Sequence, residues 1–256
     1  MHTVLVLDFD GVICDSLAEC FASSWTAFHV LFRKADPGVP TLAQKAAFAR
    51  LRPFIRTGED FVVIQDLIWR GIDVRDQPEF DAHVHRAGVE NRTAFRNLFY
   101  QARAEMLERD RAGWLGLNKI YPHMAHAFTL LPPDAPLFIL STKKPRFIAE
   151  ILAEHDITVA EKRIVLSESE PKLVTVEKIR KAGGFLRAIL VEDQIDAIKD
   201  NRNEAIQAYL AQWGYVKAEW LIPPLAVPVL RPAEFIDLIK VGDWSPSTQG
   251  IGAEPL

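Results

Sequence analysis

An apolar run at residues 4–7 is followed at once by Asp8-Phe9-Asp10-Gly11, and this combination constrains the fold more than any other feature of the chain. The run predicts a buried β-strand. Side chains two residues apart in an extended segment can point the same way, so both carboxylates can face one site, and Gly11 allows a sharp turn beside them. Two close carboxylates repel unless a divalent cation or a retained proton offsets the charge, an arrangement that suits catalysis. The alternative is a loop that carries two solvated acids.

The composition is that of an ordinary globular protein. The 256 residues are 49% hydrophobic and 25% charged, with a formal net charge of -4. These values argue against disorder and against a nucleic-acid binder, which normally carries a basic excess. Cys14 and Cys20 do not make a disulfide framework, strand-like residues begin at Thr3, and no apolar run approaches the roughly 20 residues of a membrane span. We therefore expect a cytoplasmic protein without a signal peptide or a membrane partner, and the sequence indicates no oligomeric state.

Apolar, strand-like runs recur along the chain, with helical patterns between the later ones. They lie at residues 4–7, 137–140, 164–166, 188–191, 209–213 and 227–230, and a closing helix is expected over 232–241. Runs this apolar are typical of parallel strands that are covered on both faces. The pattern predicts an α/β fold with a doubly wound, mainly parallel sheet of the Rossmann-like kind. We expect this core to span residues 1–15 and 119–242, followed by a loose tail over 243–256.

Residues 16–118 carry helical patterns and no convincing strand pattern, which predicts a helical cap domain inserted after the first strand. Four aromatic residues fall on one helical face: Phe21, Trp25, Phe28 and Phe32. Such a stripe is more often domain core than a ligand-binding surface. Thr41 and Gln44 form a capping pattern, and a long helix is expected over 91–110. Breaks between helices are expected at Pro53, Gly58, Gly71 and Pro78.

Polar residues follow four of the predicted strands, at the edge where a doubly wound sheet binds its ligands. These residues are Asp8 and Asp10; Ser141, Thr142 and Lys143; Lys172; and Glu192, Asp193 and Asp196. Hydroxyl and lysine groups can hold a phosphate, and carboxylates can hold magnesium. Taken singly, Lys172 is more often a solvated lysine, Thr142 a helix cap and Asp193 an acidic loop residue. Their order along the chain favours one shared site.

Four segments resemble the motifs of a known family. Residues 4–16 resemble its first motif, residues 138–145 its second, Lys172 the lysine of its third and residues 191–196 its acidic fourth. The family is the haloacid dehalogenase-like hydrolases, and the chain resembles phosphatase-type members that carry a helical cap inserted after the first motif. The motif resemblance is confined to the sheet domain, since the helical insert matches only in position and type.

The resemblance implies chemistry for five of these residues. Asp8 would be the nucleophile that forms an aspartyl-phosphate, and Asp10 the general acid that protonates the leaving oxygen and later activates water. Members that displace halide lack an acid at the second position, so Asp10 favours phosphoryl chemistry. Magnesium would bind the Asp8 carboxylate, the Asp10 backbone carbonyl and Asp193. Thr142 and Lys172 would hold the transferred phosphoryl group.

Two motifs depart from the family pattern. Glu192 stands where the fourth motif usually has a glycine, and Asp196 follows Asp193 by three residues instead of four, so either Glu192 or Asp196 could supply a second carboxylate to the metal. In the third motif Pro171 precedes the lysine, whereas a proline more often follows it. In the second motif Ser141 is a possible alternative register.

Four residues are candidates for contacts with the substrate. Ser141 and Lys143 are expected to bind substrate beside the phosphoryl group. Arg52 and Arg56 could pair with a second anion of the substrate, although a solvated helix face is the commoner role for such a pair. The leading prediction is a magnesium-dependent phosphohydrolase that acts on a small phosphorylated metabolite. A sugar phosphomutase would use the same core residues, and a catalytically weak binding or regulatory protein of the same fold is a third possibility.

Overall fold

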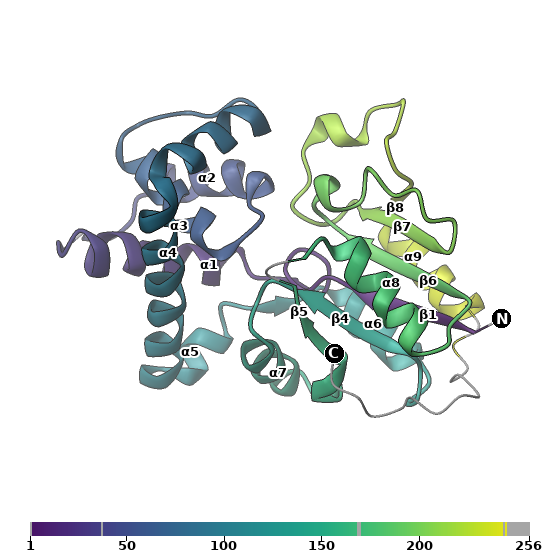
Figure 1. The fold of residues 1–256 in the computed structure, drawn as a ribbon. Helices are drawn as coiled ribbons and strands as arrows, with labels where there is room; N and C mark the ends of the chain where they lie inside the picture. The colour runs from purple at the N-terminus through teal and green to yellow at the C-terminus, as the bar shows by residue number, and fades with distance from the viewer. Residues whose placement is uncertain (1, 37, 168–169, 243, 245–256) are drawn as a thin grey trace. The chain divides into compact units, whose positions relative to one another are not determined.

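The apolar runs form a six-stranded parallel sheet with the strand order β5-β4-β1-β6-β7-β8 (Figure 1). The structure is a computed structural model that describes residues 2–36, 38–167, 170–242 and 244. The strands are β1 (Thr3–Leu7), β4 (Leu137–Ser141), β5 (Ile164–Leu166), β6 (Arg187–Glu192), β7 (Ile206–Ala211) and β8 (Val229–Leu230). Residues 4–7 of β1 are fully buried because β1 pairs with β4 on one side and β6 on the other.

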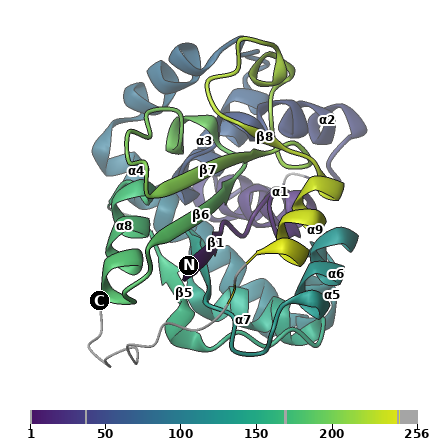
Figure 2. The same cartoon turned by 90° about the vertical axis from the view of Figure 1, so that its right-hand side faces the viewer.

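Helices cover both faces of this sheet. They are α6 (Pro122–Leu130), α7 (Pro145–Glu154), α8 (Lys172–Ala182) and α9 (Pro232–Val241). Val176 of α8 belongs to a hydrophobic cluster with Val4 and Val6 of β1. Because side chains alternate along a strand, Leu5 faces the other way, and Figure 2 shows α6 and α9 on the side of the sheet opposite α8. The doubly wound α/β fold predicted from the sequence is confirmed.

The strand after β6 is displaced from its predicted position. It begins at Ile206 rather than at residue 209, because the pairing with β6 starts there, and it ends two residues before Trp213. Trp213 leaves the sheet, and its indole N–H donates to the backbone carbonyl of Val12 at 2.9 Å. Of the predicted run 227–230, only the last two residues pair as β8.

The chain divides into two compact units, one of residues 1–15 and 120–256 and one of residues 16–119. The chain passes between them at β2 (Cys14–Asp15) and β3 (Lys119–Ile120), which form a two-stranded sheet. The second unit is helical, with α1 (Leu17–Trp25), a π-helix η1 (Thr26–Phe32), α2 (Leu42–Leu51), a 3-10 helix η2 (Arg52–Phe54), α3 (Gly58–Trp69), α4 (Gln77–Arg109) and α5 (Arg111–Leu115).

The longest helix of this unit, α4, starts earlier than the helix predicted over 91–110. Pro78, expected to be a break, lies in its first turn, where a missing N–H costs nothing, and the Asp76 carboxylate caps that turn by accepting the Glu79 N–H at 2.9 Å. The true break is at Gly88, whose φ of 76° is non-helical. The capping pattern at Thr41 is present as predicted.

The helical unit has its own core. Phe21, Trp25 and Phe28 are buried in it as predicted, whereas Phe32 is 42% exposed. The core also holds a buried ion pair: the Arg103 guanidinium makes two hydrogen bonds of 2.8 Å to the carboxylate of Glu19. Both side chains are almost completely buried, so each depends on the other for its charge to be tolerated.

Other predictions concern the ends and the cysteines. Of the tail predicted to be loose, residues 243 and 245–256 lie outside the described residues, while Trp244 is buried and donates to the carbonyl of Ile239 at 2.7 Å. Cys14 and Cys20 are both free thiols. Among the described residues, none of the helices combines the length and apolar character required to cross a bilayer.

Candidate active site

The chain turns sharply as it leaves β1, and the turn places the first carboxylate at the edge of the sheet. The backbone N–H of Asp8 still pairs with the Val191 carbonyl of β6 at 3.0 Å, so Asp8 is fixed as an extension of the strand. The Phe9 carbonyl then accepts the N–H groups of Ile13 and Cys14 at 2.9 Å. This closed turn holds the Asp8–Gly11 segment in place at the carboxyl ends of the strands.

Lys172, the first residue of α8, lies between two buried carboxylates. Its ammonium is 2.8 Å from an oxygen of Asp8 and 2.5 Å from an oxygen of Glu192. The other Glu192 oxygen accepts the backbone N–H groups of Asp193 and Gln194 at 3.1 and 3.0 Å. Glu192 therefore orients both the lysine and the loop that follows β6, a role that a glycine at this position could not supply.

Burial and charge perturb the ionisation of this cluster. Burial, with the nearby Glu192 as the next cause, raises the pKa of Asp8 to about 7, although Lys172 opposes the rise. Burial also raises the pKa of Glu192. For Lys172, burial lowers the pKa, but Asp8 and Glu192 together outweigh burial and raise it above its usual value. Two carboxylates thus share one cation, and the site holds more negative charge than Lys172 alone can neutralise.

An oxygen-rich site that could hold a metal is formed by Asp8, Glu192 and Asp193. One carboxylate oxygen from each residue lies within 4.8 Å of the others, and all three residues are buried. A set of carboxylate oxygens suits a hard divalent cation such as Mg²⁺. The raised pKa of Asp8 is in keeping with this fit, because a second positive charge would offset the cost of burying the Asp8 charge and its repulsion by Glu192.

Two glycines enclose Asp193. Gly11 has a φ of +92°, and a Cβ added there would lie 1.9 Å from a carboxylate oxygen of Asp193. A Cβ added at Gly214 would lie 2.4 Å from the Cβ of Asp193. The same carboxylate accepts the Tyr215 N–H at 2.9 Å, and the Tyr215 hydroxyl donates to Asp15 at 2.8 Å. The sequence analysis missed the segment after β7; its signal was the Gly214-Tyr215 pair that closes the strand-like run.

Asp10 has a lysine partner of its own. The Lys143 ammonium is 2.8 Å from an Asp10 oxygen and 5.3 Å from the centre of the Phe9 ring, and only 1% of the Lys143 side chain is exposed. The Lys143 N–H donates to the hydroxyl of Ser141 at 3.2 Å. Thr142, which lies between Ser141 and Lys143 in the sequence, is half-buried. The loop after β4 therefore directs Lys143 at Asp10, a contact that the sequence analysis, which assigned Lys143 to substrate binding, did not foresee.

Three other predicted site residues make contacts with residues outside this cluster. Asp196 is in the short helix η4 (Ile195–Ala197), where it pairs with Lys199 at 2.5 Å, and it is not one of the three clustered carboxylates. Arg52 and Arg56 belong to the helical unit. Arg52 is buried with its guanidinium 5.3 Å from the centre of the Phe61 ring, and Arg56 pairs with Asp81 at 2.5 Å.

Comparison with known proteins finds proteins of similar structure. No protein-family model matches the sequence, and no curated protein matches it. Solved structures do match over nearly the whole chain. A protein from Lactobacillus delbrueckii subsp. bulgaricus, whose assignment as a phosphoglycolate phosphatase is itself a prediction, has a TM-score of 0.62 and 15% identity, covering 94% of this chain and 98% of its own. A haloacid dehalogenase-like family hydrolase from Streptococcus pneumoniae has a TM-score of 0.55 and 14% identity, covering 92% and 97%.

A third structure, a predicted phosphatase from Clostridium acetobutylicum, is similar to the same extent. Its TM-score is 0.55 and its identity 14%, with 93% of this chain and 98% of that chain covered. Likeness at this level of identity establishes the fold. The chain therefore has the fold of the haloacid dehalogenase-like hydrolases, with the helical insert after β1, as the four motifs predicted.

Proposed function

We propose that this protein is a magnesium-dependent phosphohydrolase that acts on a small phosphorylated metabolite through an aspartyl-phosphate on Asp8. The observation that carries the proposal is the buried cluster at the strand ends, where Lys172 lies 2.8 Å from Asp8 beside a triad of carboxylates. A lysine next to a carboxylate nucleophile can neutralise phosphoryl oxygens, and a carboxylate triad can hold a cation.

The proposed reaction has two steps. In the first, a carboxylate oxygen of Asp8 attacks phosphorus and the bond to the leaving oxygen breaks, with Asp10 giving that oxygen a proton. In the second, Asp10 takes a proton from water, the water oxygen attacks phosphorus, and inorganic phosphate leaves as the Asp8 carboxylate is regenerated. Lys172 and Thr142 would hold the phosphoryl oxygens through both steps.

The remaining groups would prepare the site. Asp8, Asp193 and the Asp10 carbonyl would hold Mg²⁺, which supplies positive charge to the transferred group when bound. Lys143 would keep the Asp10 carboxylate in position through their 2.8 Å contact. Glu192 would keep Lys172 beside Asp8 and serves as the candidate for the additional metal-side carboxylate, because it belongs to the clustered triad and Asp196 does not.

The test is release of inorganic phosphate from an aryl phosphate and a panel of phosphorylated metabolites, with and without Mg²⁺. Because three of the similar structures are described as phosphoglycolate phosphatases by prediction, small phosphorylated carboxylates belong in the panel. Asp8→Asn is expected to abolish release, and Asp193→Asn to abolish the stimulation of release by Mg²⁺. Asp200→Asn, an exposed residue beyond β6, is the matched control and should leave both unchanged.

The outcomes separate the alternatives. Turnover that survives Asp8→Asn would contradict the assigned nucleophile. Conversion of a sugar phosphate to its isomer, without release of phosphate, would show a phosphomutase instead. No reaction with any compound would favour a binding or regulatory protein of the same fold.

A further inference from the structure

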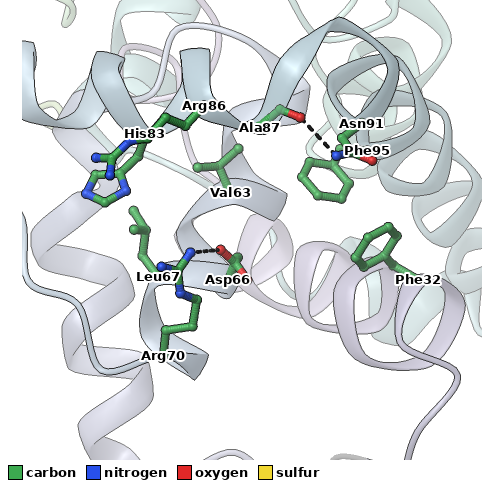
Figure 3. A pocket seen from close by; sticks show the side chains of 10 residues that line it. All are labelled: Phe32, Val63, Asp66, Leu67, Arg70, His83, Arg86, Ala87, Asn91 and Phe95. Carbon is green, nitrogen blue, oxygen red and sulfur yellow. Dashed lines mark hydrogen bonds and ion pairs between the residues drawn. The ribbon is translucent and has the colours of Figure 1, made fainter.

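A pocket of about 260 Å³ lies within the helical unit, between α3 and α4 (Figure 3). Its floor is apolar and includes Val63 and Leu67 of α3 and Phe95 of α4, all of which are buried. Figure 3 shows Phe32 of η1 at one side of the cavity. This volume is slightly below the usual range for drug-sized ligands, which is about 300–1,000 Å³, and therefore suits a smaller molecule; an apolar floor with a few polar groups is the usual lining of such sites.

The interruption of α4 brings two stretches of that helix to the pocket. Gly88 has a non-helical φ of 76°, so His83, Arg86 and Ala87 come from the segment before the break and Asn91 from the segment after it. The Asn91 side-chain amide donates to the Ala87 carbonyl at 2.9 Å, which closes the backbone at the break (Figure 3). The pocket is thus a built feature of the helical unit rather than a gap between loosely packed helices.

The rim of the pocket carries a net positive charge. It includes the guanidinium groups of Arg70 and Arg86 and the carboxylate of Asp66, which pairs with Arg70 at 3.2 Å. Arg86 donates its Nε–H to the Ala82 carbonyl at 3.1 Å, and in the described part of the chain it has no carboxylate partner. With His83 neutral, two positive charges and one negative charge leave one positive charge at the rim. That balance matches a monoanion better than a dianion.

We propose that this pocket binds a small carboxylate with an apolar body, whose oxygens are held by Arg86 and His83 and whose apolar part packs on Leu67 and Phe95. A planar guanidinium can hold a carboxylate through two parallel hydrogen bonds, and a neutral imidazole supplies one more donor. Figure 3 shows the side chains of His83 and Arg86 extending toward the same part of the cavity, with Leu67 between them and Arg70. The pocket shares no residue with the cluster at the strand ends, and the proposal does not depend on the proposed function.

Binding should strengthen as the pH falls. Burial is the main cause that lowers the pKa of His83; Arg86 and Arg70 also lower it, whereas Glu79 and Asp66 act in the opposite direction. A bound carboxylate would add a negative charge beside the imidazole and favour its protonation. Since protonated His83 would attract the ligand more strongly, affinity should rise as the pH falls below about 6.5.

The test uses phenylacetate as the probe, with binding to the full-length protein measured by isothermal titration calorimetry. Wild type should bind phenylacetate, and phenylacetamide, which has the same shape without the charge, should bind at least about tenfold more weakly. Arg86→Gln should weaken phenylacetate binding by about tenfold or more. Because Arg86 is exposed, this variant should fold normally. The matched control is Arg109→Gln, an exposed arginine on the same helix that does not line the pocket, and it should bind as wild type does.

Several results would overturn the proposal. No binding of phenylacetate up to about 10 mM would remove it, as would equal binding by wild type and Arg86→Gln. Equal affinity for phenylacetate and phenylacetamide would show an apolar cavity without anion recognition. His83→Gln gives an independent check: it should abolish the gain in affinity between about pH 7 and pH 5, and a gain that persists would exclude His83 from the site.

Discussion

Replacing Asp8 with asparagine should stop phosphoryl transfer and, at the same time, stabilise the metal-free protein at alkaline pH. The two effects have one cause. Asp8 is buried, and its carboxylate shares the Lys172 ammonium with Glu192, so ionising Asp8 is costly in the folded protein. Asparagine has nearly the same shape as a protonated aspartate and removes that cost together with the nucleophile.

The size of the expected gain in stability follows from the shift in the pKa of Asp8. Burial, with Glu192 as the next cause, raises the pKa of Asp8 from 3.8 to about 7. Between these values the folded state binds more protons than the unfolded state, so this residue contributes less stability as the pH rises, and the whole loss is present above about pH 7. At about 1.4 kcal/mol per pH unit, the loss is about 4 kcal/mol. Asp8→Asn should therefore gain up to about 4 kcal/mol at about pH 8.5 and almost nothing below about pH 4.

The assay is urea unfolding of wild type and Asp8→Asn with a chelator present, at several pH values across this range. Asp200→Asn, which removes an exposed carboxylate, should match wild type within about 0.5 kcal/mol throughout. Adding Mg²⁺ should stabilise wild type more than Asp8→Asn and reduce the difference between them. A variant that is no more stable than wild type at alkaline pH, or a difference that does not change with pH, would refute the argument.

Three further substitutions probe the packing of the two units by the same unfolding measurement. Lys172→Met should cost about 3–5 kcal/mol at neutral pH because it leaves two buried carboxylates without their cation, whereas Lys178→Met, on the exposed face of the same helix, should cost at most about 1 kcal/mol. Gly11→Ala should cost more than about 3 kcal/mol, since strain at positive φ adds to a clash of the new Cβ with a carboxylate oxygen of Asp193 at 1.9 Å. Its control is Gly71→Ala, which is also at positive φ but has open space around it and should cost about 1–2 kcal/mol. Glu19→Gln should cost about 3–5 kcal/mol by leaving a buried guanidinium unpaired. A loss in either control as large as in its partner would contradict these expectations.

The fold class could be predicted from the sequence because buried strands are recognisable as short runs of apolar residues. Apolar runs at 4–7, 137–140 and 188–191 could be recognised as strands without any partner, since strands covered on both faces must be apolar throughout. The strand after β6 was placed three residues late, because its true start at Ile206 depends on pairing with β6. The start of α4 was missed because Pro78 can either end a helix or begin one.

The sequence also predicted some residues of the candidate site but not all of the contacts between them. Asp8, Lys172 and Asp193 could be named because each follows a recognisable strand, and the carboxyl ends of parallel strands meet at one edge of the sheet. Their catalytic roles remain predictions. The sequence could not show that Lys143 faces Asp10, because that contact joins two loops that are far apart along the chain.

What the sequence alone determined is the order of strands and helices and the set of polar residues at the strand ends, because hydrophobic periodicity and turn residues are local properties. The tertiary structure decided which charges meet. It placed Glu192 against Lys172, left Asp196 with Lys199, and enclosed Asp193 between two glycines. The contacts of Glu192 with Lys172 and of the two glycines with Asp193 join segments that only the folded chain brings together, and electrostatic interactions depend on such distances and on burial.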